Sequence, residues 1–449
     1  MKNLTEGNIS KNFIKFSIPL IMSNFLANAY SIADTIIVGR YLGEHGLAAL
    51  GSTASFVTVI SSLIWGLGSG IAIYIASVFG TKDYKKCVNS VKTNLIIISI
   101  FAFLVSMLAI VFYKPVFHVL AVNSEIWHDS FVYYAIYMAG FVSLAFNWSS
   151  VYTLNSMGNS SFAFKISLMT CVGNILGNII FVATFDWGVA GAAIASVLMT
   201  FSGTICYILK FKREFKKLGV AKEKIIFEKK EIIKAWKMGI PSMLQQMAMY
   251  FSSVGVQPAV NILGNSAIAA YSVCLRIYSV MSSVFQNFSK GFSNYCAQCI
   301  GGKKVNMISM GMKISIKQSF AFTIPVMLVL YIFPQQIADL FYGDGGGEGT
   351  HYVVRYIMLC VPFVLCQVIN NMFHNFYRGV LMPKIALYTT LVYSVVRVVS
   401  TYALVPFFKM DGIFFGFIIP WFVEMVVCIV IYLSNKWKND WYKALERIN

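Results

Sequence analysis

Long apolar stretches, separated by polar turns, follow one another along almost the whole chain. A helix needs about 20 mostly apolar residues to cross the hydrocarbon of a bilayer, and twelve stretches approach or exceed that length. The predicted spans are Phe13–Gly39, Leu47–Phe79, Leu95–Phe112, Phe131–Trp148, Ile166–Phe185, Val189–Leu209, Ala235–Val260, Ile268–Ile300, Ile314–Phe333, Tyr352–Phe376, Ile385–Phe408 and Ile413–Leu433. The pattern therefore predicts an all-α polytopic membrane protein with twelve transmembrane helices.

The composition also favours a membrane protein. Hydrophobic residues make up 58% of the 449 residues and charged residues 12%, whereas soluble domains carry about 25% charged residues. A soluble protein of this size has no way to keep so much apolar surface from water. The lone Cys296–Cys299 pair has no second cysteine pair or histidine cluster beside it, so we expect no metal and no cofactor.

The formal net charge of +18 is explained by where the basic residues fall. Cytoplasmic loops of membrane proteins are enriched in Lys and Arg. If both termini are cytoplasmic, most of the 36 basic residues lie on that side, and Arg40, Lys114 and Lys409 are the ones clearly outside. The charge therefore indicates topology in the plasma membrane and contact with membrane lipid, and it gives no reason to expect nucleic acid as a partner.

A basic segment divides the chain into two sets of six spans. Residues 210–231 contain nine basic and four acidic residues. We interpret this segment as a solvated cytoplasmic hinge close to anionic lipid headgroups. The expected domains are an N-terminal six-helix bundle over 1–209, the linker over 210–231, a C-terminal six-helix bundle over 232–435 and a cytoplasmic tail over 436–449.

The two halves resemble each other at an offset of 221 or 222 residues. The matching positions include Pro19 with Pro241, Gly43 with Gly264, and Gly191 with Gly412. Because each half has an even number of spans, both halves enter the membrane from the same side. The repeat is therefore expected to be parallel, with pseudo-twofold symmetry along the membrane normal. Such an architecture suits alternating access, in which one bundle rocks against the other.

Polar side chains run along one face of several predicted helices. Residues three or four apart lie on the same face of a helix, and such stripes occur in the first, seventh and tenth spans. We expect these stripes to line a cavity for a small-molecule substrate. Their members are Asn24, Asn28, Ser31, Gln246, Tyr250, Ser253, Gln257, Gln367 and Asn370. The alternative is that such groups join helices by hydrogen bonds, but the stripes are longer than helix joining requires.

Two acidic residues, Asp34 and Glu424, lie within predicted spans. A carboxylate in the bilayer interior is costly unless it is partnered or protonated, so it is a functional candidate. Asp34 lies on the polar stripe of the first span and is a candidate for binding H⁺ or Na⁺, with a structural hydrogen bond as the alternative. For Glu424 we expect a structural ion pair with Arg397 of the neighbouring span.

The region around Asp34 resembles a known family. The segment Ser31–Arg40, SIADTIIVGR, is similar to the first-helix signature of the multidrug and toxic compound extrusion (MATE) transporters. Further matches follow in family order across nearly the whole chain, at Leu42-Gly43, Leu47-Ala48-Ala49, Gly188–Ser196, Arg378-Gly379 and Arg397-Val398-Val399. The resemblance implies an antiporter that exchanges H⁺ or Na⁺ for cationic or amphipathic drugs.

The resemblance also implies an ion site in the N-terminal half. Asp34 matches the first-helix acid of the family, and other family positions match Asn174, Ser196 and Tyr137, with Tyr133 as the alternative to Tyr137. The second acid of that site aligns with Asn178 here. An amide does not titrate and only donates or accepts hydrogen bonds. One protonatable carboxylate therefore remains, and an altered coupling ion or an untypical substrate is an open alternative.

We therefore expect a secondary active transporter that exports small organic compounds by H⁺ or Na⁺ antiport with alternating access and acts as a monomer. The alternative is a flippase for a lipid-linked sugar or another amphiphile of the same broad superfamily. Such a flippase would need a groove rich in Arg and Lys to hold pyrophosphate. A membrane enzyme is not expected, because the sequence has no HExxH motif and no P-loop.

Overall fold

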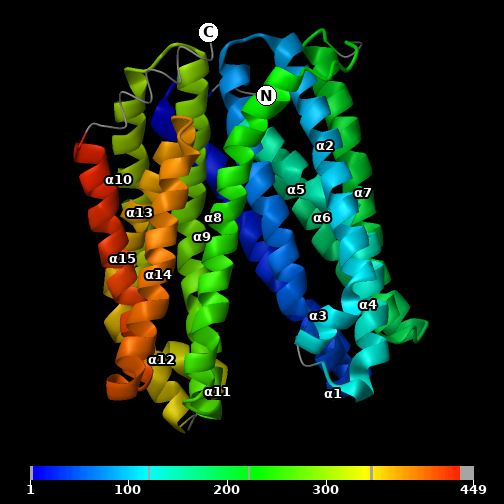
Figure 1. Cartoon of the computed structure of the whole chain (residues 1–449), viewed down its shortest axis with the longest axis vertical. Coiled ribbons are helices and arrows are strands. Elements are labelled where there is room, and N and C mark those ends of the chain that lie inside the picture. Colours follow the sequence, from blue (N-terminus) through cyan, green and yellow to red (C-terminus); the bar gives the residue numbers. More distant parts are fainter. Residues whose placement is uncertain (1–3, 120–121, 221–222, 344–346, 435–449) are drawn as a thin grey trace. The chain divides into compact units, whose positions relative to one another are not determined.

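The computed structural model describes residues 4–119, 122–220, 223–343 and 347–434, without the side chains of residues 28, 29, 31, 44, 55 and 119. Within these ranges all regular structure is helical, as predicted. The described chain forms two compact units, shown in Figure 1. The first unit is Ile18–Met243, and the second unit joins Leu4–Ser17 to the residues from Leu244 onward.

The helices of the first unit follow the predicted spans. They are α1 (Ile9–Gly80, from Ile18 onward), α2 (Tyr84–Val111), α3 (Tyr113–Val119), η1 (Ser124–Ile126), α4 (Trp127–Ala139), α5 (Phe141–Ser156), α6 (Ser160–Asn178), the π-helical η2 (Ile179–Thr184), α7 (Gly188–Lys217) and the start of α8 (Lys229–Asn261). Those of the second unit are the rest of α8, then α9 (Asn265–Gly301), α10 (Met307–Ile332), α11 (Pro334–Tyr342), α12 (Gly347–Cys360), η3 (Val361–Phe363), α13 (Val364–Gly379), α14 (Pro383–Phe408) and α15 (Met410–Leu433).

The backbone repeats itself between the units. The first two spans of each unit are separated at Gly43 and at Gly264, whose φ angles of 64° and 94° favour glycine. A short helix follows the third span of each unit, as α3 and α11. The fourth span is broken in both units, by a 49° bend between α4 and α5 and by η3 between α12 and α13. These shared irregularities confirm the internal repeat.

Ten of the described helices are long and apolar enough to cross a membrane, or eleven if α4 and α5 form one bent span. The remaining predicted span corresponds to α8, which has 33 residues. Polar side chains such as Gln245, Gln246 and Gln257 lower its hydropathy. The twelve predicted spans therefore all appear as helices, and α8 is the most polar of them.

The unit boundaries differ from the bundle limits predicted from sequence. The chain passes between the units inside α1 and inside α8, so the described part of 210–231 belongs to the first unit. Asn89 of α2 donates a hydrogen bond to the Ile226 carbonyl at 2.8 Å and accepts one from the Ile226 N–H at 2.9 Å. Glu231 accepts a hydrogen bond from Tyr74 and pairs with Lys86 at 3.3 Å. Residues 224–230 are exposed, as expected of a solvated segment, but the contacts of Ile226 and Glu231 tie the segment to the first unit.

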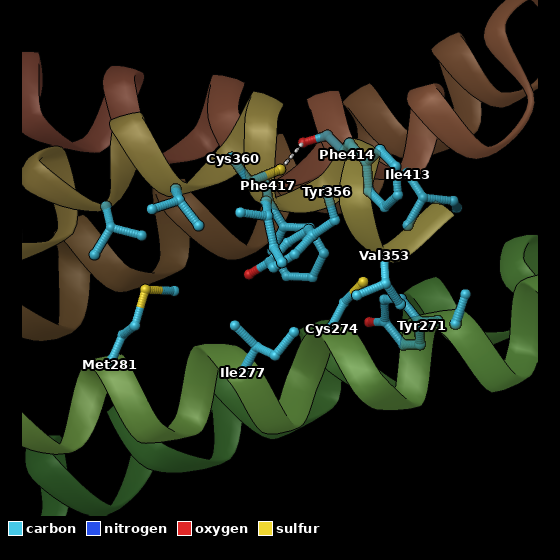
Figure 2. Close-up of a cluster of buried hydrophobic side chains, with 14 of the residues drawn as sticks. Tyr271, Cys274, Ile277, Met281, Val353, Tyr356, Cys360, Ile413, Phe414 and Phe417 are labelled. Atoms are coloured by element: carbon cyan, nitrogen blue, oxygen red, sulfur yellow. Dashed lines mark hydrogen bonds between the residues drawn. The ribbon is translucent and has the colours of Figure 1, made fainter. Parts of the chain in front are cut away.

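Apolar side chains from the helices α8 to α15 form the core of the second unit. Tyr271, Cys274, Ile277 and Met281 project from one face of α9 toward α12 and α15, as Figure 2 shows. Each of the four is at most 5% exposed. Their spacing of three or four residues places them on one helix face. The opposite face of α9 consequently lies outside this core.

Glycines of α1 allow the start of α8 to pack closely within the first unit. A Cβ atom at Gly66 would lie 2.4 Å from the Met243 Cα, and one at Gly70 would lie 2.5 Å from the Met238 carbonyl oxygen. Backbone atoms at such distances leave no room for a side chain. Small residues permit this kind of approach between membrane helices.

We expect Gly70→Ala to destabilise the protein by about 1–3 kcal/mol, because the added methyl group forces α8 away from α1. Gly51→Ala is the matched control, since a Cβ there meets nothing within 4 Å. Thermal unfolding of the purified variants in detergent measures both. An unchanged midpoint for Gly70→Ala would contradict the close packing.

The contacts of Glu231 predict a pH dependence of stability. Burial raises the pKa of Glu231, but the hydrogen bond from Tyr74 and the charges of Lys234 and Lys86 outweigh burial and lower the pKa below its usual value of 4.5. A lowered pKa stabilises the fold above the ordinary value, and this contribution is lost as the pH falls through the lowered value. We expect Glu231→Gln to have a lower thermal midpoint than the wild type at pH 7 and the same midpoint in strong acid. A difference that stays constant across pH would exclude this assignment.

Candidate functional site

A chain of hydrogen bonds connects α1, α6 and α7 within the first unit. Asn178 Nδ2 donates to Asp34 Oδ1 at 2.5 Å and to Asn174 Oδ1 at 3.0 Å. Asn174 Nδ2 in turn donates to Ser196 Oγ at 3.0 Å. The Ser196 hydroxyl lies 3.3 Å from the hydroxyl of Tyr30. The structure therefore brings Asp34 together with three of the side chains named from the family resemblance.

Local helix geometry presents these side chains to one another. Tyr30 and Asp34 are four residues apart on α1, and Asn174 and Asn178 are four apart on α6, so each pair shares a helix face. The α-helical part of α6 ends at Asn178, and the π-helical η2 begins at the next residue. Single π-helical turns occur frequently at functional sites.

The side chains around Asp34 carry amide and hydroxyl groups, and they are buried to different degrees. Asn178 is 0% exposed and Asn174 is 4% exposed, whereas Asp34 is half-buried. Asn178 Oδ1 is buried and has no hydrogen-bond partner among the described residues. Tyr137 lies close enough to interact electrostatically with Asp34, and it stacks on Tyr133 with ring centroids 6.0 Å apart. A carboxylate, an unpartnered amide oxygen and hydroxyls are ligands suited to a hard cation, and Asp34 also offers a site for a proton.

A separate cavity of about 370 Å³ lies at the loop end of the first unit. It is lined by residues from the loops and helix ends around 42–46, 128–132 and 186–190. His45 Nδ1 lies 3.3 Å from Asp129 Oδ2 there. The sequence pattern does not reveal this cavity, because its lining comes from three segments that are far apart along the chain.

The predicted substrate-cavity residues fall into three groups. Asn24 is half-buried on α1, and the side chains of Asn28 and Ser31 lie outside the described residues. The α8 stripe is partly exposed along its length, with Gln246, Tyr250, Ser253 and Gln257 all half-buried. On α13, Gln367 is 6% and Asn370 0% exposed, and Asn370 donates to the Trp421 carbonyl at 2.9 Å. Asn370 therefore has the helix-joining role in this structure, whereas the α8 stripe remains a candidate lining.

The predicted ion pair between Arg397 and Glu424 is wrong. Glu424 Oε1 lies 3.0 Å from His374 Nε2, with the two side chains 3% and 12% exposed. The contact has ion-pair distance but not the geometry of a hydrogen bond. Arg397 instead donates to the hydroxyls of Ser253, Tyr393 and Tyr271 and lies over the ring of Phe417.

The reason for this difference is which helices face each other. Residues of α14, α8 and α9 surround Arg397 with hydroxyl oxygens, which satisfy a guanidinium without an acid. The side chain that contacts Glu424 of α15 is His374 of α13. Neither His374 as the partner of Glu424 nor Tyr30 beside Ser196 was among the residues predicted from the sequence. Tyr30 was detectable, because it lies one helical turn before Asp34.

Comparison with known proteins gives a family match over both halves. The MatE family model matches residues 19–180 and 241–403. The two matched segments begin at Pro19 and Pro241, in the register of the internal repeat.

Similar proteins cover most of the chain at low identity. A probable multidrug resistance protein, YoeA of Bacillus subtilis (strain 168), is 23% identical over 79% of this chain and 78% of its own length. The multidrug export protein MepA of Staphylococcus saprophyticus is 22% identical over 77% of this chain and 76% of its own length. A solved MATE structure in a bent conformation superposes with a TM-score of 0.88 at 21% identity, covering 98% of both chains. This likeness confirms the fold of twelve helices in two bundles.

The corrected partner of Glu424 predicts a specific energetic coupling. In a double-mutant cycle of His374→Gln and Glu424→Gln, we expect a coupling of about 1–3 kcal/mol, as for residues in direct contact. The cycle of Arg397→Gln with Glu424→Gln should give a smaller coupling than the histidine cycle, because Arg397 donates to hydroxyls and not to Glu424. Unfolding of the purified variants in detergent measures both cycles. A larger coupling for the arginine cycle would restore the ion pair predicted from sequence.

Proposed function

Because the chain belongs to the MatE family of multidrug efflux transporters, we propose that it exports small organic compounds, cationic or amphipathic, by exchanging them for H⁺ or Na⁺ in an alternating-access cycle. The long apolar helices make the chain an integral membrane protein. Within the proposal both termini lie in the cytoplasm of the plasma membrane, the transporter acts as a monomer, and it needs no cofactor besides the coupling ion. The distribution of the basic residues supports this orientation.

The observation that carries the proposed coupling is the Asp34 carboxylate held by Asn178. Asp34 belongs to the long apolar helix Ile9–Gly43, where a bare carboxylate is costly. The amide of Asn178 supplies one hydrogen bond but no charge. An added H⁺ or Na⁺ removes the remaining cost, so the site has a physical reason to bind one cation.

Cation binding would drive transport through its effect on the conformational equilibrium. A bound ion shifts such an equilibrium only as far as its affinity differs between the two states. In the described state Asp34 and the unpartnered Asn178 oxygen are held on adjacent helices. We propose that this arrangement binds the ion more tightly than the other state does, and that the exported compound favours the state with an empty ion site.

A single carboxylate limits the coupling chemistry of this site. Relative to the two-acid pattern, Asn178 replaces a group that could titrate with one that cannot. The site therefore changes its charge by one unit per ion bound. Hydrogen bonds link five side chains here, those of Asp34, Asn178, Asn174, Ser196 and Tyr30. Of these, Asp34 is the one that ionises in the ordinary pH range.

We expect Asp34→Asn to abolish ion-driven transport while leaving the protein folded, because the amide keeps the size of the carboxylate but binds no cation by charge. Everted membrane vesicles with an imposed H⁺ or Na⁺ gradient and ethidium as the test compound measure this. The variant should fall to the rate of vesicles without the protein. The ion whose gradient drives the wild type identifies the coupling ion.

Asp83→Asn is the matched control, since it makes the same chemical change at the start of α2. Asp83 accepts a hydrogen bond from the Lys86 N–H at 3.0 Å, and Asn caps a helix about as well as Asp. The control should transport like the wild type. Wild-type rates for Asp34→Asn would remove the coupling role, whereas failure of this variant to reach the membrane would make Asp34 a structural residue.

A further inference from the structure

The face of α9 opposite the core residues labelled in Figure 2 carries a row of polar residues in the sequence. Its residues recur every three or four positions and therefore lie on one side of the helix. They are Ser272, Arg276, Ser279, Ser283, Gln286 and Lys290, which we call the α9 polar face. Arg276 is exposed and Lys290 is half-buried. The polar face thus carries two cations on a membrane-spanning helix.

Neither cation pairs with an acidic residue in the part of the chain that the structure describes. The sequence contains no Asp or Glu between Glu231 and Asp339, so α8, α9 and α10 from residue 232 onward carry none. Arg276 and Lys290 form no hydrogen bond or ion pair with any described residue. The charged group that acts on Lys290 is another cation, Arg378 of α13. The region therefore has a local excess of positive charge.

Other arginines of the second unit are partnered. Arg355 donates to both carboxylate oxygens of Asp411 at 2.5 Å, and Arg397 donates to three hydroxyls. The guanidinium groups of these two arginines are therefore hydrogen-bonded within the unit. Arg276 and Lys290 differ from these two arginines, because neither has a partner among the described residues.

The two cations lie in the interior of α9, away from both of its ends. At the α-helical rise, each lies about 16 Å from one end of this 37-residue helix. The helix is longer than the hydrocarbon layer, which is about 30 Å thick, and both cations lie in its interior rather than at its ends. An unpartnered cation facing acyl chains at that depth is costly, and such groups normally face water-filled space. We therefore expect the α9 polar face to meet water or a polar ligand.

The charges are specific to the second unit. At the offset of the repeat, Arg276 corresponds to Ser55 and Lys290 to Ser69. The equivalent helix of the first unit thus has neutral side chains at both places. The helix architecture does not require these charges, which leaves ligand binding as their physical reason.

We propose that the α9 polar face binds the anionic group of exported compounds, so that the substrates include amphipathic organic molecules bearing a sulfonate, carboxylate or phosphate. The statement that the ligand is exported rests on the proposed function. Arg276 and Lys290 are about 21 Å apart along the helix, too far for one small anion to contact both. They are therefore two separate binding positions along α9. The hydroxyls of Ser279 and Ser283 and the amide of Gln286 lie between them.

Two dyes that differ by one charged group test the proposal. 8-Anilinonaphthalene-1-sulfonate and N-phenyl-1-naphthylamine share their ring system, but the first carries a sulfonate. Fluorescence titration of the purified full chain in detergent gives an affinity for each. Losing a charged hydrogen-bond donor by Arg276→Gln or Lys290→Gln should weaken sulfonate binding by about tenfold. Binding of the uncharged dye should be unchanged, and Arg276→Lys should retain most of the sulfonate affinity.

The matched control removes two charges elsewhere in the second unit. Lys313 and Lys317 are exposed on α10, and the double variant Lys313→Gln/Lys317→Gln should bind the sulfonate like the wild type. Equal affinity of wild type and Arg276→Gln/Lys290→Gln for the sulfonate would overturn the proposal. An equal loss of both dyes, or an equal loss in the control, would overturn it as well.

A lipid headgroup is the competing occupant and has its own arm of the test. The wild type is titrated in lipid discs of phosphatidylcholine with and without phosphatidylglycerol. Sulfonate binding should be the same in both. Competition by phosphatidylglycerol that disappears in Arg276→Gln/Lys290→Gln would assign the face to lipid and overturn the substrate assignment.

The binding test and the transport test can refute the anion site and the proposed function separately. Titration needs no ion gradient, so charge-dependent binding without gradient-driven transport in vesicles would refute the coupling and leave the anion site in place. Gradient-driven transport of ethidium together with sulfonate binding that ignores Arg276 and Lys290 would refute the anion site and leave the exporter.

Discussion

The cost of placing a charge inside the hydrocarbon is the constraint on which the chemistry of this protein depends. The described helices meet this cost in three ways. Asp34 accepts a hydrogen bond from an amide, Glu424 lies against the imidazole of His374, and Arg397 donates to neutral hydroxyls. None of these three groups is paired with a permanent opposite charge. A membrane interior makes such arrangements costly without further ions or water, so each one marks a place where binding of an ion or ligand changes the free energy most.

The two units share a scaffold but not their charges. The glycine breaks at Gly43 and Gly264 and the short helices α3 and α11 recur at the same offset. Asp34, however, corresponds to Val256, and Arg276 corresponds to Ser55. The first unit thus carries an acid suited to a cation, and the second unit carries cations suited to an anion. In the proposed cycle this division would let a coupling ion and a substrate of opposite charge use different units.

The connection between the units is helical. The chain passes from one to the other inside α1, next to Pro19, and inside α8, close to Pro241. The described part of the basic linker is instead tied to α2 by Asn89 and by the ion pair of Glu231 with Lys86. Proline removes a backbone hydrogen bond within a helix, so both crossings lie beside places where a helix bends at low cost. The linker itself is not a free hinge.

The sequence by itself determined the helices, their number and the repeat, because hydropathy and glycine positions act locally and survive in any arrangement of the helices. It also identified Asp34, whose burial in an apolar span is visible without a fold. Only the tertiary structure decided which side chains meet: that Asn178 donates to Asp34, that Glu424 meets His374 and leaves Arg397 to hydroxyls, and that Arg276 and Lys290 share an unpartnered face. Such contacts depend on which helices are neighbours and how each is rotated, and the near-uniform apolarity of membrane helices leaves both unspecified in the sequence pattern.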